Sequence, residues 1–226
     1  MIEPVLFHWP QHASFGRAVP KAKVYQHGNV RTALRERFVD EVRRITWAYK
    51  LAEDTVRLRG TAVVPEIQVF TIEAKGADVS DDVLAAIDKT VHFPIIFEVV
   101  SDESVRTAAA QKTLRSKAPM IGTYFTTDWQ PVDAPRRALP TALDLPGLYE
   151  AILASLLPLP MRVGETVRQV TDRLDRAHKL QREIAALEKK LRNEPQLNRK
   201  IELLKQLKQR EAAHAEMTDP APSKRG

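Results

Sequence analysis

The sequence predicts an α+β protein: a mostly antiparallel sheet with packed helices, followed by a C-terminal antiparallel helical hairpin of the coiled-coil type. Two observations lead to this prediction. Residues 66–75 alternate apolar and polar with the period of a half-buried strand, and the later stretches 94–100, 105–114 and 121–127 are rich in apolar and β-branched residues. The apolar residues of the C-terminal region instead recur at spacings of three and four and are symmetric about Glu194.

The first fifty residues are expected to form an irregular segment and one helix. Residues 1–28 contain Pro and Gly among aromatic residues that would attach the segment to the body, namely Phe7, Trp9, Phe15 and Tyr25. Residues 31–50 carry apolar side chains at helical spacing. This spacing predicts an amphipathic helix with one face against the sheet.

The sheet and a second helix follow in the chain. A short strand is expected over 55–58, before the strand 66–75. Ser80 is a typical N-cap residue, which predicts that its hydroxyl accepts backbone N–H groups at the start of a helix over 82–90. The pair Asp102-Glu103 predicts a hairpin turn between two of the later strands.

Composition divides the chain into four regions. The sequence after Trp129 is punctuated by proline, and the last residues are polar and rich in Pro. The predicted regions are a globular α+β domain (1–130), a Pro-rich connector with a short helix at 147–157 (131–163), the hairpin (164–217) and a disordered tail (218–226).

The two arms of the hairpin are predicted to pair through their apolar stripes. Reflection about Glu194 places Leu191 on Leu197, Leu187 on Ile201 and Ile184 on Leu204. Residues 192–195 favour a turn, because Pro195 restricts the residue before it and Asn193 tolerates a cap conformation. A continuous helix with a kink at this point is the alternative. Either form would extend about 30 Å for arms of some 20 residues, long enough to reach a partner.

Bulk properties restrict the function. The chain has 226 residues, a net charge of +6 and a pI near 9.6, which favours polyanionic partners. It contains no Cys, so thiol catalysis, disulfides and cysteine metal sites are excluded. There is no signal peptide pattern and no apolar run long enough to span a membrane, and we therefore expect a cytoplasmic protein.

Most of the common cofactor motifs are missing from the sequence. It contains no Walker loop, no dinucleotide fingerprint and no nucleophile elbow, so no cofactor is predicted. His8 and His12 are four residues apart, but Pro10 breaks the helix that would bring them together, so no metal site is predicted there either.

One sequence motif is typical of a metal-dependent nuclease. Glu73 and Lys75 end the strand 66–75, and Asp54 precedes the first predicted strand. Two carboxylates that hold Mg²⁺ and a lysine that stabilises charge are what restriction-endonuclease-like enzymes need for phosphodiester hydrolysis. The same pattern also fits an exposed ion pair at a sheet edge. The sequence does not favour a catalytic role of these residues over that structural role.

A second group mixes basic and aromatic residues, a combination suited to phosphates and stacked bases. Its basic members are Lys21, Lys23, Arg43, Arg44 and Lys50, and its aromatic members are Tyr25, Trp47 and Tyr49. The alternative is that these aromatic side chains belong to the core or hold the N-terminal segment in place.

Several of these stretches together resemble the bacterial family called domain of unknown function 4391. The stretches that are similar are 15–17, 19–21, 44–52, 66–75, 84–89, 92–98 and 190–203. The resemblance implies a genomic setting beside helicases and adenine methyltransferases in restriction-type anti-phage systems.

Three hypotheses follow from the resemblance and the residues. The first is a non-catalytic adaptor that docks on a helicase or DNA methyltransferase partner near DNA, with polar contacts from the hairpin residues Arg182, Lys189, Arg199 and Lys205. The second is the Mg²⁺-dependent nuclease. The third is a protein that self-associates, because amphipathic arms can exchange between copies.

Overall fold

The computed structural model describes residues 4–27, 31–113 and 119–219, and it divides the chain into two compact units. The first unit, 1–157, is called the body, and the second, 158–226, is called the hairpin unit. The helix of the predicted connector belongs to the body, so the unit boundary follows that helix. Most of the predicted tail lies outside the described residues. No helix among the described ranges is both long and apolar enough to cross a bilayer.

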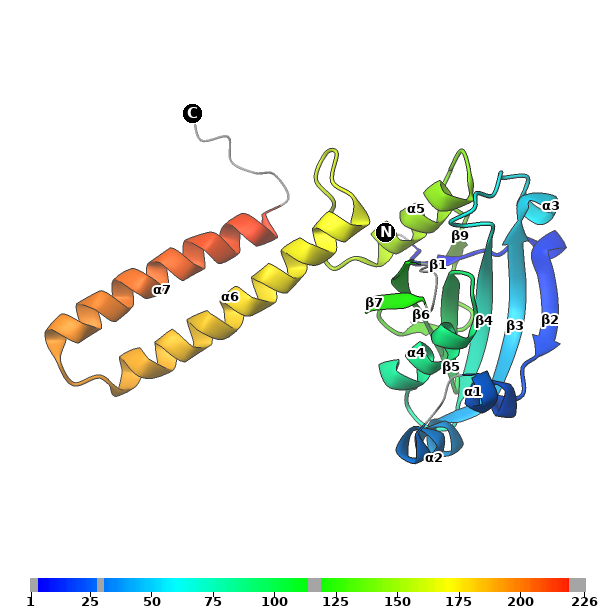
Figure 1. Cartoon of the computed structure of the whole chain (residues 1–226). Coiled ribbons are helices and arrows are strands. Elements are labelled where there is room, and N and C mark those ends of the chain that lie inside the picture. The colour runs from blue at the N-terminus through cyan, green and yellow to red at the C-terminus, as the bar shows by residue number, and fades with distance from the viewer. Residues whose placement is uncertain (1–3, 28–30, 114–118, 220–226) are drawn as a thin grey trace. The chain divides into compact units, whose positions relative to one another are not determined.

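The body is built on a seven-stranded sheet, and Figure 1 shows helices packed against it. The strand order is β2-β3-β4-β5-β6-β7, with β8 beside β6; β4 and β5 are parallel and the other neighbours are antiparallel. The strands are β2 (Ser14–Ala18), β3 (Val42–Ala52), β4 (Glu66–Ala74), β5 (Ile95–Ser101), β6 (Ser104–Thr113), β7 (Met120–Thr126) and β8 (Gln130–Pro131). A separate parallel pair joins β1 (Leu6–Phe7) and β9 (Arg136–Arg137). The predicted α+β class and mostly antiparallel sheet are confirmed.

Helices cover both faces of this sheet. On one face, α1 (Lys21–His27), α2 (Thr32–Glu41) and α4 (Asp81–Thr90) enclose a core that includes Phe38, Phe70 and Phe97. The alternate residues of the strands, such as Ile67 and Ile96, are buried on the other face, where α5 (Leu145–Leu156) packs against β4, β6 and β7. Trp9 also reaches a buried residue of the sheet, donating from Nε1 to Glu98 Oε1 at 2.8 Å.

The predicted helix over 31–50 is only half right. Helix α2 ends at Glu41, and Val42–Ala52 form β3, one of the longest strands of the sheet. This stretch is rich in β-branched and aromatic residues, and it pairs with β4 along its whole length. Strand pairing therefore overrides an apolar spacing that a helix could also use.

Two smaller predictions were also wrong. Residues predicted as the strand 55–58 contribute instead to the short helix α3 (Glu53–Val56), because Thr55 Oγ1 accepts from the Ala52 amide at 2.8 Å and Arg57 ends the helix with φ 57°. Ser80 precedes α4 as predicted, but its hydroxyl makes no capping bond, and its amide donates to Glu41 Oε2 at 2.7 Å. The turn at Asp102-Glu103 is confirmed, with Asp102 at φ 49°.

The hairpin unit consists of two antiparallel helices packed side by side, α6 (Val167–Asn193) and α7 (Leu197–Thr218). Three residues, 194–196, connect them, so the chain turns here rather than continuing as one kinked helix. At helical rise the arms are about 40 Å and 33 Å long. The predicted hairpin and the position of its turn are confirmed.

Candidate functional sites in the body and the hairpin

A row of aromatic side chains crosses the face of the sheet that α1, α2 and α4 cover. Phe15, Trp47, Phe70, Phe97 and Tyr124 follow one another with ring centroids 4.1, 6.2, 6.3 and 6.1 Å apart. Phe70 and Phe97 are buried in the core, whereas Trp47 is half-buried and Phe15 is 39% exposed. The row therefore begins as an accessible aromatic surface on β2 and β3 and continues into the core.

Two β-bulges create this surface. In β2, Ser14 pairs with Tyr49 and Arg17 with Trp47, so an extra residue lies between them, and Gly16 takes the φ of 63° that such a bulge requires. In β3, the register shifts again between Trp47 and Tyr49. Without this second bulge, Lys50 would lie on the opposite face from Trp47, because side chains alternate along a strand.

The exposed end of the row forms one wall of a cleft of about 520 Å³, which we call the aromatic cleft. The opposite walls come from α1, from α4 and from the segment that follows α4. The lining residues are Phe15, Trp47, Lys50, Glu66, Gln68 and Phe70 from the strands, Val19, Lys23, Val24 and Ile87 near or in the helices, and Thr90, Val91, His92 and Phe93. The cleft is thus apolar in its depth, with a few ionisable groups around it.

Those groups are arranged on two sides. Lys50 Nζ lies 3.6 Å from Glu66 Oε2, and Gln68 Nε2 donates to Glu66 Oε1 at 2.5 Å. Lys23 is exposed on α1, across from the strands. The guanidinium of Arg17 lies 5.2 Å from the centre of the Phe15 ring, a cation–π distance. Three cations, Arg17, Lys23 and Lys50, and one carboxylate, Glu66, therefore lie around the accessible aromatic surface.

A buried ion pair holds the segment after α4, which forms one wall of the aromatic cleft. Lys112 Nζ lies 2.8 Å from Asp88 Oδ1, and both side chains are almost completely buried. The same ammonium donates to the carbonyls of Asp88, Val91 and Phe93, at 2.7, 2.5 and 2.8 Å. Tyr124 donates to the other carboxylate oxygen of Asp88 at 2.8 Å. Burial raises the pKa of Asp88 and lowers that of Lys112, and each charge opposes the shift of the other.

Of the basic residues predicted to bind nucleic acid, Lys23 and Lys50 meet in the cleft. Arg43 and Arg44 are exposed at the first bulge of β3, outside the cleft lining. Lys21 has a structural role, because its ammonium donates to the Phe38 carbonyl at 3.0 Å and to the Val42 carbonyl. Burial, followed by repulsion from Lys75, lowers the pKa of Lys21.

The residues of the nuclease hypothesis do not converge. Ala52 pairs with Glu66 at one end of the β3–β4 ladder, while Glu73 pairs with Arg44 near the other end. Asp54 follows Ala52 and is therefore about 20 Å or more from Glu73 at the rise of a strand. Lys75 donates to the Val39 carbonyl at 2.5 Å, near the C-terminal end of α2. Within the described ranges, no group of three metal-ligating side chains is placed to hold an ion.

At the hairpin tip, the arms pair in a different rotation from the predicted one. Three apolar residues of α7 that we call the tip triplet, Leu197, Ile201 and Leu204, are 72%, 57% and 41% exposed. Leu203 and Leu207 are less exposed than the triplet, and Leu207 is buried. The reflected stripes therefore do not close on one another. Their misfit leaves a groove of about 660 Å³ near the turn, lined by residues of both helices, among them Lys189 and Arg199.

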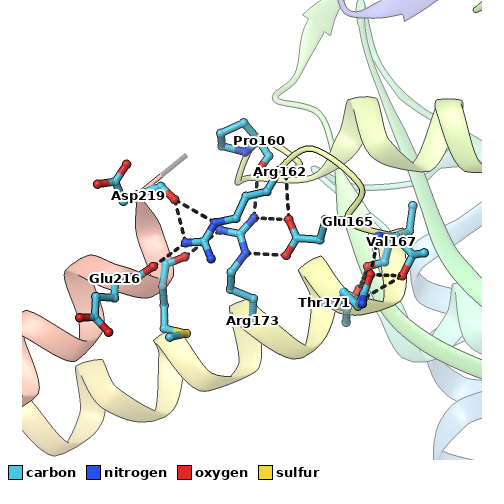
Figure 2. Close-up of polar contacts among 11 residues, drawn as sticks. Pro160, Arg162, Glu165, Val167, Thr171, Arg173, Glu216 and Asp219 are labelled. Carbon is cyan, nitrogen blue, oxygen red and sulfur yellow. Dashed lines mark hydrogen bonds and ion pairs between the residues drawn. The ribbon is translucent and has the colours of Figure 1, made fainter. Parts of the chain in front are cut away.

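The base of the hairpin is held by a cluster that we call the base clasp, formed by Arg162, Glu165 and Arg173 (Figure 2). Arg173 is 5% exposed and binds both carboxylate oxygens of Glu165, at 2.8 and 2.9 Å. It also donates to the Met217 carbonyl at 2.7 Å and to the Pro160 carbonyl at 2.8 Å. Arg162 donates to the carbonyls of residues 216 and 219. The clasp thus joins the start of α6 to the end of α7.

The profile described as "Domain of unknown function (DUF4391)" matches residues 7–213, which include nearly all of the body and most of the hairpin. The chain belongs to the DUF4391 family. No significant match was found among curated proteins or among solved structures. The family match confirms the resemblance drawn from the sequence, and it shows that DUF4391 includes both the sheet and the helical arms.

Proposed function

We propose that this DUF4391 protein is a non-catalytic, cytoplasmic accessory subunit that docks through its hairpin tip on a protein partner. Following the setting that the resemblance implies, the partner is a helicase or adenine methyltransferase of a bacterial restriction-type defence system. The observation that carries the proposal is the tip triplet, three large apolar side chains exposed in succession along one side of α7. Such an apolar face, rimmed by polar residues, is typical of a protein–protein interface.

The charge around the triplet specifies the partner further. Residues 180–210 contain nine Lys and Arg against four Asp and Glu, so this part of the hairpin alone carries +5 of the net +6 of the chain. Arg182, Lys189, Arg199 and Lys205 are all exposed there. The complementary surface is therefore an apolar patch surrounded by acidic side chains.

A folded partner suits this surface better than nucleic acid does. Leu and Ile side chains are stabilised by removal from water, at about 25 cal/mol per Å² buried, but they have no flat ring on which a base could stack. The basic rim would contribute mainly to the association rate and to orientation, since exposed charge pairs add little affinity. The base clasp supports the same function, because it keeps the two arms paired at the end opposite the tip.

The test compares two triple variants of the full chain in the native host. Leu197→Ser, Ile201→Ser and Leu204→Ser remove the triplet, whereas Val63→Ser, Val132→Ser and Leu143→Ser remove three exposed apolar residues of the body as a matched control. Each variant is purified with its bound proteins, which are identified by mass spectrometry. A helicase or methyltransferase that is retained by the control and lost from the tip variant supports the proposal. Equal retention by both variants would refute it.

A DNA cleavage assay and a measurement of molar mass address the other two hypotheses. DNA cleavage with Mg²⁺ that is abolished in Glu73→Gln would favour the nuclease. A dimeric mass in light scattering that becomes monomeric in the tip variant would show that the triplet binds a second copy of the chain instead of a different protein.

A further inference from the structure

We propose that the aromatic cleft of the body binds a nucleotide, with the base against Phe15 and Trp47 and the phosphate between Lys23 and Lys50. The proposal goes beyond docking by the hairpin, because it concerns a different unit of the chain and different residues. The volume of about 520 Å³ lies within the range typical of pockets for small ligands, roughly 300–1,000 Å³.

The aromatic surface is prepared for a planar ligand. Trp47 is held by a hydrogen bond from its Nε1 to the Tyr49 carbonyl at 2.9 Å. Its ring is supported from the core side by Phe70, whose plane is inclined by only 14°. Phe15 extends the surface towards solvent and is 39% exposed. Trp47 therefore lies between Phe70, at 6.2 Å, and Phe15, at 4.1 Å, and the accessible ring of Phe15 is the one on which a base would stack.

The geometry of the bulges indicates that aromatic and basic groups are brought together for a ligand. Arg17 pairs with Trp47 after the bulge at Gly16, and the register shift in β3 turns Lys50 onto the face of Trp47. In a regular β3, Lys50 would lie on the opposite face from Trp47. Bulges are a common way to redirect a side chain towards a site.

The polar groups complement the two ends of a nucleotide. The 3.6 Å separation between Lys50 and Glu66 is long for an ion pair, which leaves donors of the Lys50 ammonium directed elsewhere. Lys23 approaches the cleft from α1, so the two ammonium groups can contact one phosphate from opposite sides. Glu66 and Gln68 provide acceptors and donors for the polar edge of a base.

Two sources can supply this chemistry: a free nucleotide, or an unpaired nucleotide of single-stranded DNA. A base within duplex DNA is excluded because both of its faces are already stacked. The experiment therefore compares nucleoside monophosphates, a short single strand and the matching duplex.

Binding is followed by fluorine NMR of the full chain labelled with fluorotryptophan. The protein has three Trp residues, so Trp47 gives one of three signals and is assigned with Trp47→Phe. A shift of the Trp47 signal reports on the cleft even if DNA also contacts the basic hairpin. The signals of Trp9 and Trp129 report whether each variant keeps the fold of the body.

Phe15→Ala and Lys23→Gln test the two halves of the site, and Lys89→Gln, an exposed lysine of α4 outside the cleft lining, is the matched control. Loss of stacking on Phe15 should weaken binding about five- to a hundredfold. Single-strand binding weakens with salt, and the slope of the logarithm of the binding constant against the logarithm of the salt concentration should become less steep by about 0.7 in Lys23→Gln. This is the contribution of one phosphate contact. Lys89→Gln should change neither quantity.

The outcomes distinguish the two sources and can overturn the proposal. Monophosphates that shift the Trp47 signal as strongly as a single strand at equal concentration identify a free nucleotide as the ligand. A single strand that binds much more tightly identifies DNA. The proposal is overturned if no probe shifts the Trp47 signal, if the duplex shifts the Trp47 signal as strongly as both the single strand and the monophosphates do, or if Phe15→Ala and Lys23→Gln bind like the control.

Discussion

Replacement of Lys112 by methionine tests whether one buried ammonium organises the wall of the aromatic cleft. Methionine keeps the length and most of the volume of the lysine side chain but removes its charge and its donors. In the native body, this ammonium pairs with the carboxylate of Asp88 and with three main-chain carbonyls. The variant would leave all four acceptors behind, and two of them, the carboxylate and the main-chain carbonyl of Asp88, are buried.

The loss in free energy of unfolding follows from the acceptors that Lys112→Met leaves unpaired. Removal of one partner of a buried ion pair costs about 3–5 kcal/mol, because the other charge stays buried without compensation. The carbonyls of Val91 and Phe93 lose a donor as well, which places the expected loss near the top of this range. Since domains are stable by only about 5–15 kcal/mol, Lys112→Met should lose from about a third to all of the stability of the body.

The stability loss of Lys112→Met should increase as the pH rises. Burial already raises the pKa of Asp88, and loss of Lys112 removes the main opposing charge, so the carboxyl of the folded variant stays protonated to higher pH. A group whose pKa is higher in the folded state than in the unfolded state stabilises the fold fully below the unfolded value, about 3.9 for Asp. The deficit of the variant should therefore be smallest in acid and grow as the pH rises above that value.

Tryptophan fluorescence in denaturant measures this loss without interference from the hairpin. All three Trp residues lie in the body, and residues 158–226 contain no Phe, Trp or Tyr. Lys112→Met with Asp88→Asn should recover part of the stability, because the double variant no longer buries a single charge. A loss below about 1 kcal/mol in Lys112→Met, or a deficit that shrinks as the pH rises, would refute the role assigned to the ammonium.

Three further predictions concern the base clasp and the β2 bulge. Arg173→Met should cost the hairpin about 3 kcal/mol and increase amide exchange at both ends of the arms, and unchanged exchange would contradict the clasp. The hydrogen bonds from Arg173 hold the pKa of Glu165 below its usual range, so the clasp should be intact at neutral pH and weaken as the pH falls through that lowered pKa. The amide signal of Arg162, which donates to Glu165, should follow this titration and should not do so in Glu165→Gln. Gly16→Val should destabilise the body by about 1–2 kcal/mol in the fluorescence assay, because its φ of 63° disfavours a β-branched residue, whereas Gly76→Val, at a position with open space, should cost less.

The sequence predicted the elements whose pattern has only one explanation. Residues 66–75 alternate except at the adjacent pair Val69 and Phe70, and residues 66–74 form β4. The spacing of three and four on both sides of Glu194 produces the two arms. Residues 42–52 were misassigned because Val42, Ile45 and Tyr49 fit a helical spacing, while the tendency of their neighbours to form strands is decided only by pairing with β4. Local pattern is ambiguous wherever a long-range partner determines the outcome.

The candidate cleft was predictable in composition but not in geometry. The sequence identified Lys23, Lys50 and Trp47 as a basic and aromatic group, and these three residues line one cleft. It could not show that Arg43 and Arg44 lie outside it, because that depends on register shifts with no strong sequence signal. The base clasp was missed as well, although Arg173 interrupts the apolar positions Val170, Leu174 and Ala177, which is a sign of a buried charge.

The base clasp also affects how this family can vary. The bonds from Arg162 and Arg173 to the end of α7 reach carbonyl oxygens of residues 216, 217 and 219. Every amino acid presents such an oxygen, so these bonds recognise the course of the main chain and not the identity of the residues. The end of α7 can therefore exchange side chains between homologues without loss of these bonds, whereas the two arginines cannot be exchanged. Substitutions along the arms are thus compatible with these bonds as long as the two arginines are kept.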